Sequence, residues 1–294
     1  MNIKKVKKKD KAAKIIRYNQ EIFKCPVCDK NMQLNDSYSL VCSLNHCYDI
    51  SRNGYINLLT SSKKPVYSKK LFEARHKVCR QGFYEPLIEQ LELIIKRHLG
   101  SKTGRKEVKI VDAGCGEGSH LCDLHQKIKG DPKFKLIGAD ISKEGINIAA
   151  TASNDIIWIV ADLTRLPFMN KSIDVILNIL SPANYPEFER VLSNDGIVIK
   201  VIPNRLYLKE LREVFYNNNR YSNNRVMDYF SNKLQVILTR NIRYQFNIEK
   251  ELLPDLIKMT PLTWGKSVNS KLDLQQIDIS EITVDLTILV GRKK

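Results

Sequence analysis

The sequence predicts an α/β fold, in which helices cover a mostly parallel sheet and a small metal-binding module comes first. Three observations predict it. Short apolar runs recur from Val108 onward and several end in an acidic residue, a pattern typical of buried parallel strands. The first run leads into a glycine-rich loop, Asp112 to Gly118, and then into a segment with helical spacing. Cysteine and histidine residues between positions 25 and 46 have the spacing of a zinc ribbon.

The composition indicates a cytoplasmic protein that does not enter a membrane. The 294 residues suffice for one large domain and a small one. No run of 18 apolar residues exists, and the lysine-rich first residues lack the apolar segment of a secretory signal. In such a compartment the seven cysteines are expected to be metal ligands or reduced thiols rather than disulfides.

Positive charge is concentrated in the first third of the chain. Residues 1–110 hold 24 Lys and Arg against 10 Asp and Glu, a net charge of +14, whereas residues 111–294 hold 24 against 22, a net charge of +2. These charges serve either solubility or the docking of a polyanion, and we favour the second interpretation. Residues 1–20 are lysine-rich, so we expect a flexible basic arm that buries nothing.

Residues 21–60 are predicted to form a zinc ribbon. Cys25, Cys28, Cys42 and His46 have the spacing C-x2-C-x13-C-x3-H, so that each pair forms a knuckle with two ligands. A closed shell of four ligands indicates one structural Zn²⁺, which would supply much of the stability of so small a module. Cys47 lies beside His46 and is an alternative fourth ligand.

Residues 61–100 are predicted to be a linker and a helix that lead into an α/β domain at 101–294. In this domain the strand at Val108 runs into Gly114, Gly116 and Gly118, which lack a Cβ and let the backbone approach a ligand closely. A helix containing His120 and Leu121 follows. A strand, a glycine loop and a helix N-terminus form a nucleotide-type cofactor site, but the D-x-G-x-G-x-G spacing differs from the dinucleotide pattern.

Three acidic residues end successive predicted strands. They are Asp112, Asp140 at the end of 135–141, and Asp162 after 156–160. Asp140 follows Gly114 by 26 residues, where a carboxylate can accept hydrogen bonds from ribose hydroxyls. The fourth strand, 173–180, leads to a loop in which Asn184 or Tyr185 either contacts a substrate or forms a turn. Segments 236–242 and 282–290 fit an antiparallel pair that completes a seven-stranded sheet.

The chain resembles the RlmA/TlrB family of 23S rRNA (guanine-N1)-methyltransferases. The resemblance extends from Phe23 to the C-terminus and rests on the ribbon followed by Gly-Tyr-Ile-Asn-Leu-Leu at 54–59, on Leu-Phe-Glu-Ala-Arg at 71–75, on Gly-Phe-Tyr-Glu-Pro-Leu at 82–87, on the glycine loop, and on Met-Thr-Pro-Leu-Thr-Trp at 259–264. It implies a class I (Rossmann-like) S-adenosylmethionine methyltransferase domain behind the zinc ribbon.

The resemblance also implies a function and a cofactor site. The chain would transfer a methyl group from S-adenosyl-L-methionine to N1 of a guanine in a hairpin loop of 23S ribosomal RNA, with the ribbon recognising RNA. A homodimer and an effect on macrolide-type antibiotics are further implications. The proton acceptor for N1 has no assignable residue. The expected cofactor-binding residues are Tyr84, Asp112, Gly114, Gly116, Gly118, His120, Leu121, Asp140, Ile141, Asp162, Leu163 and Tyr207.

Two alternatives remain open from the residues alone. One is a small-molecule methyltransferase whose ribbon only mediates dimerisation. The other is a non-catalytic, zinc-dependent RNA-binding protein that retains the methyltransferase fold. RNA docking would make activity fall steeply with salt, whereas a small-molecule reaction would be insensitive to salt.

Overall fold

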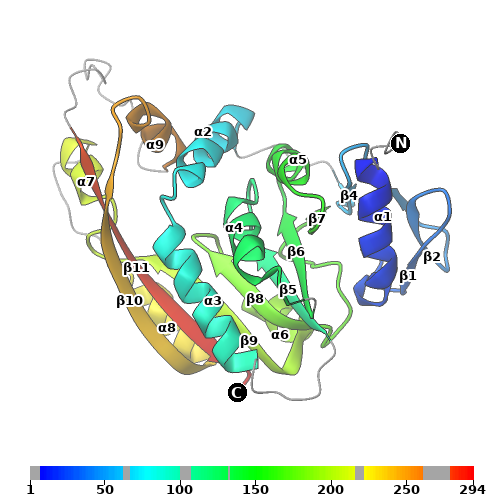
Figure 1. Cartoon of the computed structure of the whole chain (residues 1–294). Coiled ribbons are helices and arrows are strands. Elements are labelled where there is room, and N and C mark those ends of the chain that lie inside the picture. The colour runs from blue at the N-terminus through cyan, green and yellow to red at the C-terminus, as the bar shows by residue number, and fades with distance from the viewer. Residues whose placement is uncertain (1–6, 62–66, 100–106, 132, 216–221, 261–278) are drawn as a thin grey trace.

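The computed structural model describes residues 7–61, 67–99, 107–131, 133–215, 222–260 and 279–294 (Figure 1). Two sheets are present in these ranges. A small antiparallel sheet contains β1 (Met32–Leu34), β2 (Ser39–Cys42) and β3 (Cys47–Asp49). The central sheet contains β4 (Tyr55–Asn57), β5 (Val108–Ala113), β6 (Phe134–Asp140), β7 (Ile157–Val160), β8 (Ile173–Ile179), β9 (Leu192–Pro203), β10 (Gln235–Asn247) and β11 (Glu281–Arg292).

The central sheet has the strand order β10-β11-β9-β8-β5-β6-β7-β4. Neighbouring strands from β4 to β9 are parallel, whereas β11 is antiparallel to both β9 and β10. The chain therefore proceeds from β5 to one side through β6 and β7, and then to the other side through β8 and β9. The loops after β5 and β8 diverge at this reversal, and open α/β sheets bind ligands at such a point.

Helices cover both faces of the central sheet (Figure 1). On one face lie α3 (Glu85–Leu99), α4 (Ser119–Ile128) and α5 (Lys143–Ala152), and on the other lie α6 (Tyr185–Val191) and α8 (Asn224–Lys233). Strand side chains alternate between two cores, since Ile110 of β5 joins the first and Val111 joins the second. This arrangement confirms the predicted fold class.

Three further helices lie at the ends of the sheet (Figure 1). They are α2 (Lys69–Arg80), α7 (Lys209–Phe215) and α9 (Leu253–Met259), and α2 packs against α9. Across the described ranges, no helix combines the length and the apolar character needed to span a bilayer. In α3, which leads into the α/β domain, Leu87, Leu91 and Ile95 form an apolar stripe that is fully buried.

The expectation of seven strands is wrong by one, because β4 adds an eighth. Tyr55 and Asn57 pair in parallel with Trp158 and Val160 of β7, so the end of the expected ribbon module belongs to the central sheet. Pairing over 103 residues of sequence depends on the folded arrangement, and three residues carry too short a pattern to reveal a strand. The ribbon is thereby joined to the sheet edge through backbone hydrogen bonds.

The expectation that residues 1–20 form a flexible arm that buries nothing is also wrong within the described part. Residues 8–18 form the helix α1 (Lys8–Tyr18), and a short 3-10 helix, η1 (Gln20–Ile22), follows. Ala12, Ala13 and Ile16 lie on one face of α1 and are buried in the same core as the ribbon. Lysine stems flank this narrow apolar stripe, so the charge count concealed a helix that packs by one face.

Candidate functional site

The four predicted metal ligands converge at the ribbon knuckles. One ligand atom from each of Cys25, Cys28, Cys42 and His46 lies within 4.8 Å of the others. The Cys28 and Cys42 sulfurs are 3.6 Å apart, and His46 Nδ1 lies 3.6 Å from Cys25 Sγ and 3.3 Å from Cys42 Sγ. Zinc–sulfur bonds of about 2.3 Å at tetrahedral angles place two sulfurs about 3.7 Å apart, so the cluster fits a tetrahedral Zn²⁺.

Cys47 is not part of this cluster. Its side chain is exposed on β3, and among the described residues its sulfur does not join the cluster formed by Cys25, Cys28, Cys42 and His46. The Cys3His set closes the shell with protein ligands and leaves no position for a substrate, which is the character of a structural zinc site. Within the described chain, the alternative in which Cys47 replaces His46 is therefore disfavoured.

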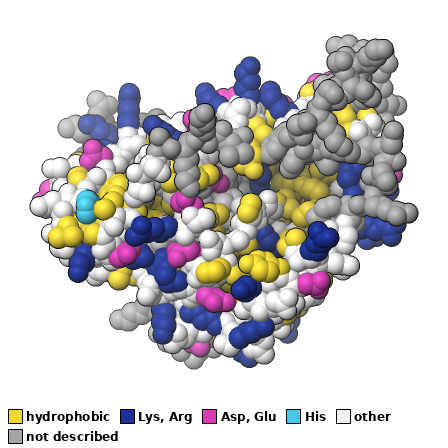
Figure 2. Space-filling view, turned by 180° about the vertical axis from the view of Figure 1, so that it is seen from behind, with side chains coloured by type: hydrophobic (Ala, Val, Ile, Leu, Met, Phe, Trp, Pro, Cys, Tyr) yellow, Lys and Arg dark blue, Asp and Glu magenta, His cyan; other side chains and the backbone are white. Residues whose placement is uncertain are grey.

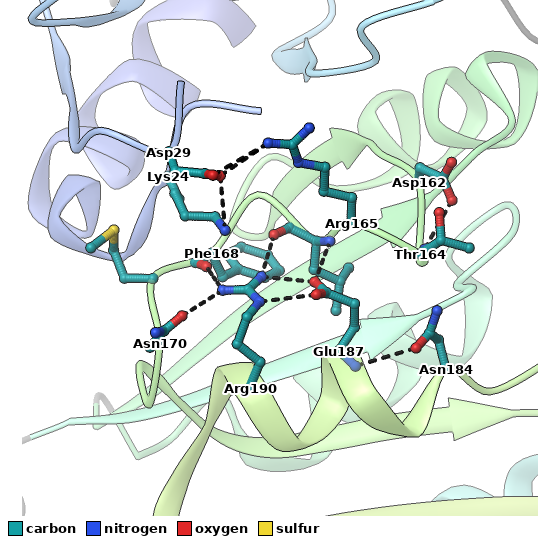
Figure 3. A network of polar contacts seen from close by, with 12 residues as sticks. Lys24, Asp29, Asp162, Thr164, Arg165, Phe168, Asn170, Asn184, Glu187 and Arg190 are labelled. Atoms are coloured by element: carbon teal, nitrogen blue, oxygen red, sulfur yellow. Dashed lines mark hydrogen bonds and ion pairs between the residues drawn. The ribbon is translucent and has the colours of Figure 1, made fainter. Parts of the chain in front are cut away.

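The ribbon is attached to the segment that follows β7. Lys24 N donates to Pro167 O at 3.0 Å, and Met169 N donates to Ile22 O at 2.7 Å. The Phe23 and Phe168 rings pack with their centroids 6.0 Å apart. Figure 3 shows that the Asp29 carboxylate also lies between Lys24 Nζ at 3.0 Å and the Arg165 guanidinium at 3.2 Å.

Side chains of α6 also form hydrogen bonds to the segment that follows β7 (Figure 3). Arg190 donates to the carbonyl oxygens of Leu166 and Phe168, and its guanidinium also contacts the Glu187 carboxylate. Glu187 Oε2 accepts from Leu166 N at 2.9 Å, while Glu187 N donates to Asn184 Oδ1 at 3.2 Å. Asn184 thus caps α6, which confirms the turn role among its two predicted roles. The ribbon and the loop after β8 are consequently held by one polar network.

A cavity of about 870 Å³ opens at the carboxyl ends of the central strands. In the view from behind, hydrophobic side chains gather in a hollow of the surface, with lysine and arginine side chains around it (Figure 2). Its volume lies within the range of cavities that hold a small molecule or a cofactor. The predicted residues that line it are Tyr84, Gly114, Gly116, Asp140, Ile141, Asp162, Leu163 and Tyr207.

The glycine loop forms one wall of this cavity. Gly114 has φ +89 and Gly116 has φ +58, which is the left-handed region that other residues rarely adopt. A Cβ on Gly114 would lie 2.0 Å from Ser181 Oγ, so this glycine lets the loop after β5 touch the loop after β8. Backbone atoms at this point are therefore exposed to a ligand at close range.

Asp140 and Asp162 present carboxylates to the cavity from neighbouring strand ends. Asp140 Oδ2 accepts from Gly116 N and Oδ1 accepts from Ser142 N, both at 2.8 Å. Burial raises the pKa of Asp140, while these backbone donors oppose the shift. Asp162 Oδ1 accepts from Thr164 N at 2.9 Å. Each Asp140 oxygen has a second lone pair that can accept from a ligand hydroxyl.

Two tyrosines that are far apart in sequence meet at the cavity wall. The Tyr84 and Tyr207 hydroxyls are 2.7 Å apart, and the Tyr84 ring packs against the His120 ring with centroids 4.7 Å apart. Burial lowers the pKa of His120 well below its ordinary value, so the ring is neutral. A neutral His120 can accept at Nδ1 from Arg75 Nη2, which lies 3.4 Å away.

Four predicted cofactor residues lie behind the cavity lining. Leu121 is fully buried in the core, and the His120 ring packs against the Tyr84 ring. Gly118 ends the loop, and a Cβ on this glycine would lie 2.6 Å from the Trp158 ring. Asp112 is completely buried, and neither carboxylate oxygen has a hydrogen-bond partner in the described structure. Burial raises the pKa of Asp112 to about 7. Among these four, Asp112 and His120 carry buried polar atoms, both Asp112 carboxylate oxygens and His120 Nε2, that have no hydrogen-bond partner in the described structure.

Sequence reasoning missed the three cationic residues that line the described cavity, Arg75, Lys200 and Arg225. Arg75 lies on α2, and its Nε is 3.4 Å from Glu117 Oε1. Lys200 of β9 is only 4% exposed and donates from Nζ to Asn178 Oδ1 at 2.5 Å and to the Ser181 carbonyl oxygen. A signal for Lys200 was present, because a lysine inside the apolar strand Ile-Val-Ile-Lys-Val-Ile at 197–202 is unusual for a buried parallel strand.

Comparison with known proteins matches both parts of the chain. Residues 23–70 match the family model described as "RlmA, N-terminal", and residues 110–196 match the model described as "Methyltransferase domain". The chain is 38% identical to "Putative 23S rRNA (guanine-N(1)-)-methyltransferase YxjB" of Bacillus subtilis, over 92% of this chain and 97% of that protein.

Two further proteins are also similar over nearly the whole chain. Identity is 28% to "Putative 23S rRNA (guanine-N(1)-)-methyltransferase" of Micromonospora griseorubida, over 92% of this chain and 96% of that protein. Identity is 26% to "23S rRNA (guanine(748)-N(1))-methyltransferase" of Streptomyces fradiae, over 95% of this chain and 98% of that protein. The similarity therefore includes the ribbon, the cavity and the C-terminal strand pair together.

Proposed function

This chain belongs to the RlmA/TlrB family of 23S rRNA (guanine-N1)-methyltransferases, and we propose on that basis that it methylates N1 of a guanine in a hairpin loop of 23S rRNA. The observation that carries the proposal is the attachment of the zinc ribbon, through Pro167 and Met169, to the segment that follows the cavity-lining residues Asp162 and Leu163. The ribbon that we propose for RNA binding is thus connected directly to the segment beside the site that we propose for the methyl donor.

The cavity fits S-adenosyl-L-methionine, which supplies an activated methyl group when it is bound. We assign the ribose hydroxyls to Asp140, because its carboxylate is fixed by two backbone donors and retains lone pairs. Asp162 and Leu163 are assigned to the adenine, and Ile141 to its apolar surroundings. Gly114 and Gly116 let the backbone approach the methionine part.

Charge complementarity assigns the two ends of the methionine part. Arg75 lines the cavity near the Tyr84 hydroxyl pair, and a guanidinium is suited to hold a carboxylate. Asp112 lies behind the glycine loop, and its two buried carboxylate oxygens have no described hydrogen-bond partner. We therefore assign the positively charged groups of the cofactor to the side of the cavity nearest this carboxylate. The Tyr84–Tyr207 pair closes this end of the site.

The acceptor base is assigned to the part of the cavity beside the loop after β8. Guanine N1 lies on the Watson–Crick edge, so the nucleotide must be unpaired or flipped out before it can enter. Tyr185 and Tyr229 line this part of the cavity with aromatic rings, which lie 5.2 Å apart between centroids and suit contact with a base. The basic N-terminal third, including α1, is assigned to the RNA backbone.

The test is methylation of RNA followed by mass spectrometry of its nucleosides. Ribosomal RNA from a strain that lacks this gene should accept methyl groups and yield 1-methylguanosine, whereas RNA from the wild-type strain should accept few. Salt should reduce the rate steeply. If no RNA accepts methyl groups, or if the product is another methylated nucleoside, the proposal fails.

Two finer expectations rest on the family resemblance. We propose a homodimer, which light scattering of the purified protein would test by its mass. We also propose a cytoplasmic location, since ribosomal RNA is found there, and cell fractionation would test it. A monomer at micromolar concentration would contradict the first proposal and leave the methylation proposal intact.

A further inference from the structure

Lys200 is a buried cation at the edge of the cavity without an anionic partner in the described structure. It lies on β9 opposite Asn178 of β8, at the strand ends where the acceptor base is assigned. Its Nζ donates to Asn178 Oδ1 and to the Ser181 carbonyl oxygen, and both of these acceptors are neutral. No ion pair to Lys200 occurs among the described residues, although buried charges are usually paired.

The geometry leaves one position on this nitrogen for a group in the cavity. A neutral amine has two N–H groups and one lone pair, and here the two protein oxygens can accept both N–H groups. The lone pair is then the part of Nζ that no described protein group occupies. Asn178 is itself fixed, because its Nδ2 donates to Ala113 O at 2.7 Å and to Pro182 O at 3.0 Å.

We propose that Lys200 is the catalytic base, whose neutral amine accepts the N1 proton of the target guanine as that nitrogen is methylated. The inference rests on the proposed function, which needs a proton acceptor at N1 but does not name one. It also explains why a lysine occupies a buried strand position that is otherwise apolar.

The proposed step is balanced in atoms and charge. The N1–H bond breaks, and the proton binds the Nζ lone pair. The N1 electron pair forms a bond to the methyl carbon, while the electron pair of the broken carbon–sulfur bond stays on sulfur. The positive charge thus leaves the sulfonium and appears on the ammonium, where Asn178 Oδ1 and Ser181 O stabilise it. After product release the ammonium returns the proton to water.

The protonation equilibrium of Lys200 supports this role. Burial lowers the pKa of Lys200 to about 8, and loss of hydration is its only cause. A substantial fraction is therefore neutral near physiological pH, as a base working at that pH requires. Burial raises the pKa of Tyr185 to about 12, so this neighbour stays protonated, whereas Asp112 on β5 ionises near 7.

The other charged groups near Lys200 have described contacts of their own or lie elsewhere along the cavity. Asp140 and Asp162 accept from backbone N–H groups at the cofactor end of the cavity. On the neighbouring β11, Asp285 faces Arg243. On α8, Arg225 and Tyr229 line the cavity on the acceptor side. Of the nitrogen bases in the described cavity lining, Lys200 is the one that titrates in the neutral range.

The experiment is a single-turnover methylation of 23S rRNA across pH 6 to 9.5 with saturating cofactor. The wild-type rate should rise with pH, reach half of its maximum near pH 8 and level off above that pH. Lys200→Met should reduce the rate at pH 7.5 by about 10²–10⁴-fold and remove the levelling. Lys200→Arg restores the charge but cannot accept a proton, so it should be as slow as Lys200→Met. Primary amines added to the medium should partly rescue Lys200→Ala.

Lys293→Met is the matched control. Lys293 also donates to a backbone carbonyl, that of Leu192, and burial also lowers its pKa, but it lies outside the cavity lining. Its rate should equal that of the wild type. Melting temperatures and S-adenosylhomocysteine affinities of all variants show whether the fold and the cofactor site are retained.

Three outcomes would overturn the inference. The first is a Lys200→Arg variant within about threefold of the wild type, because a cation would then suffice. The second is a wild-type profile without an inflection between pH 7 and 9, which remains informative if the variants do not fold. The third is a pH profile of folded Lys200→Met that matches the wild type. In each case 1-methylguanosine still forms in the wild-type reaction, whereas its absence would overturn the proposed function instead.

Discussion

Gly114→Ala should destabilise the protein and impair cofactor binding, because two loops touch at this residue. The added Cβ would lie 2.0 Å from Ser181 Oγ and 2.7 Å from Ser181 Cβ, and φ would remain at +89. The left-handed backbone costs an alanine about 1–2 kcal/mol, and overpacking costs about 1–3 kcal/mol. Together they predict a loss of about 2–5 kcal/mol, or a melting temperature lower by roughly 5–15 °C.

A second substitution separates the two contributions. Ser181→Gly removes both atoms that the new Cβ would meet, so the double variant should recover the steric part and keep the backbone part. Gly130→Ala is the control, since a Cβ there has nothing within 4 Å and the backbone is not left-handed. Its stability should change by less than about 0.5 kcal/mol.

The measurements are thermal unfolding and calorimetric titration with S-adenosylhomocysteine. Gly114→Ala should weaken this ligand at least about tenfold, because the loop must move away from Ser181. The reasoning is refuted if Gly114→Ala unfolds and binds like the wild type. It is also refuted if Ser181→Gly gives no recovery in the double variant.

Three further predictions concern the metal, the ribose contact and pH. Chelation should release one zinc ion per chain and lower the melting temperature, and Cys42→Ser should have the same two effects. The Cys47→Ser variant should keep its zinc, because Cys47 lies outside the cluster. Metal analysis that finds no zinc in the wild-type protein would contradict the site. Asp140→Asn should weaken S-adenosylhomocysteine by about 10–100-fold while RNA affinity is unchanged, and equal cofactor affinity by calorimetry would remove Asp140 from the ribose site. Because burial raises the pKa of Asp112 from 3.8 to about 7, the apo protein binds a proton that the unfolded chain releases, so stability should fall as pH rises from 4 to 7 and then level off. Asp112→Asn should flatten this dependence by up to about 4 kcal/mol in denaturant titrations, and an unchanged slope would contradict the shift.

Local spacing was sufficient where the chemistry itself is local. The zinc ligands could be predicted because each knuckle presents two of them within a few residues, and they do converge. The strand ends were predictable for a similar reason. A buried parallel strand needs a continuous apolar run, so the position of Asp140 marks where that run must stop. The glycine loop was predictable because three glycines directly follow the strand, and the structure adds that Gly114 has a left-handed backbone.

Counting charges did not predict the structure of the N-terminal segment, because a few apolar residues determine how that segment packs. Lysines dominate residues 7–14, yet Ile16 and its alanine neighbours place α1 against the ribbon. A helix needs one apolar stripe to pack, and that stripe is hidden when residues are counted rather than placed at 100° intervals. The edge strand β4 was missed because a partner, Trp158, lies far away in sequence.

The sequence by itself determined the fold class, the cluster of metal-ligand side chains and the strand ends at which the cavity opens. Only the tertiary structure decided which distant side chains share the cavity: the Tyr84 and Tyr207 hydroxyls, separated by 123 residues, and the Lys200 amine held by Asn178 and Ser181. The physical reason is that backbone requirements and apolar periodicity act over a few residues. A proton equilibrium or a hydrogen bond depends instead on burial and on partners that the completed sheet brings together.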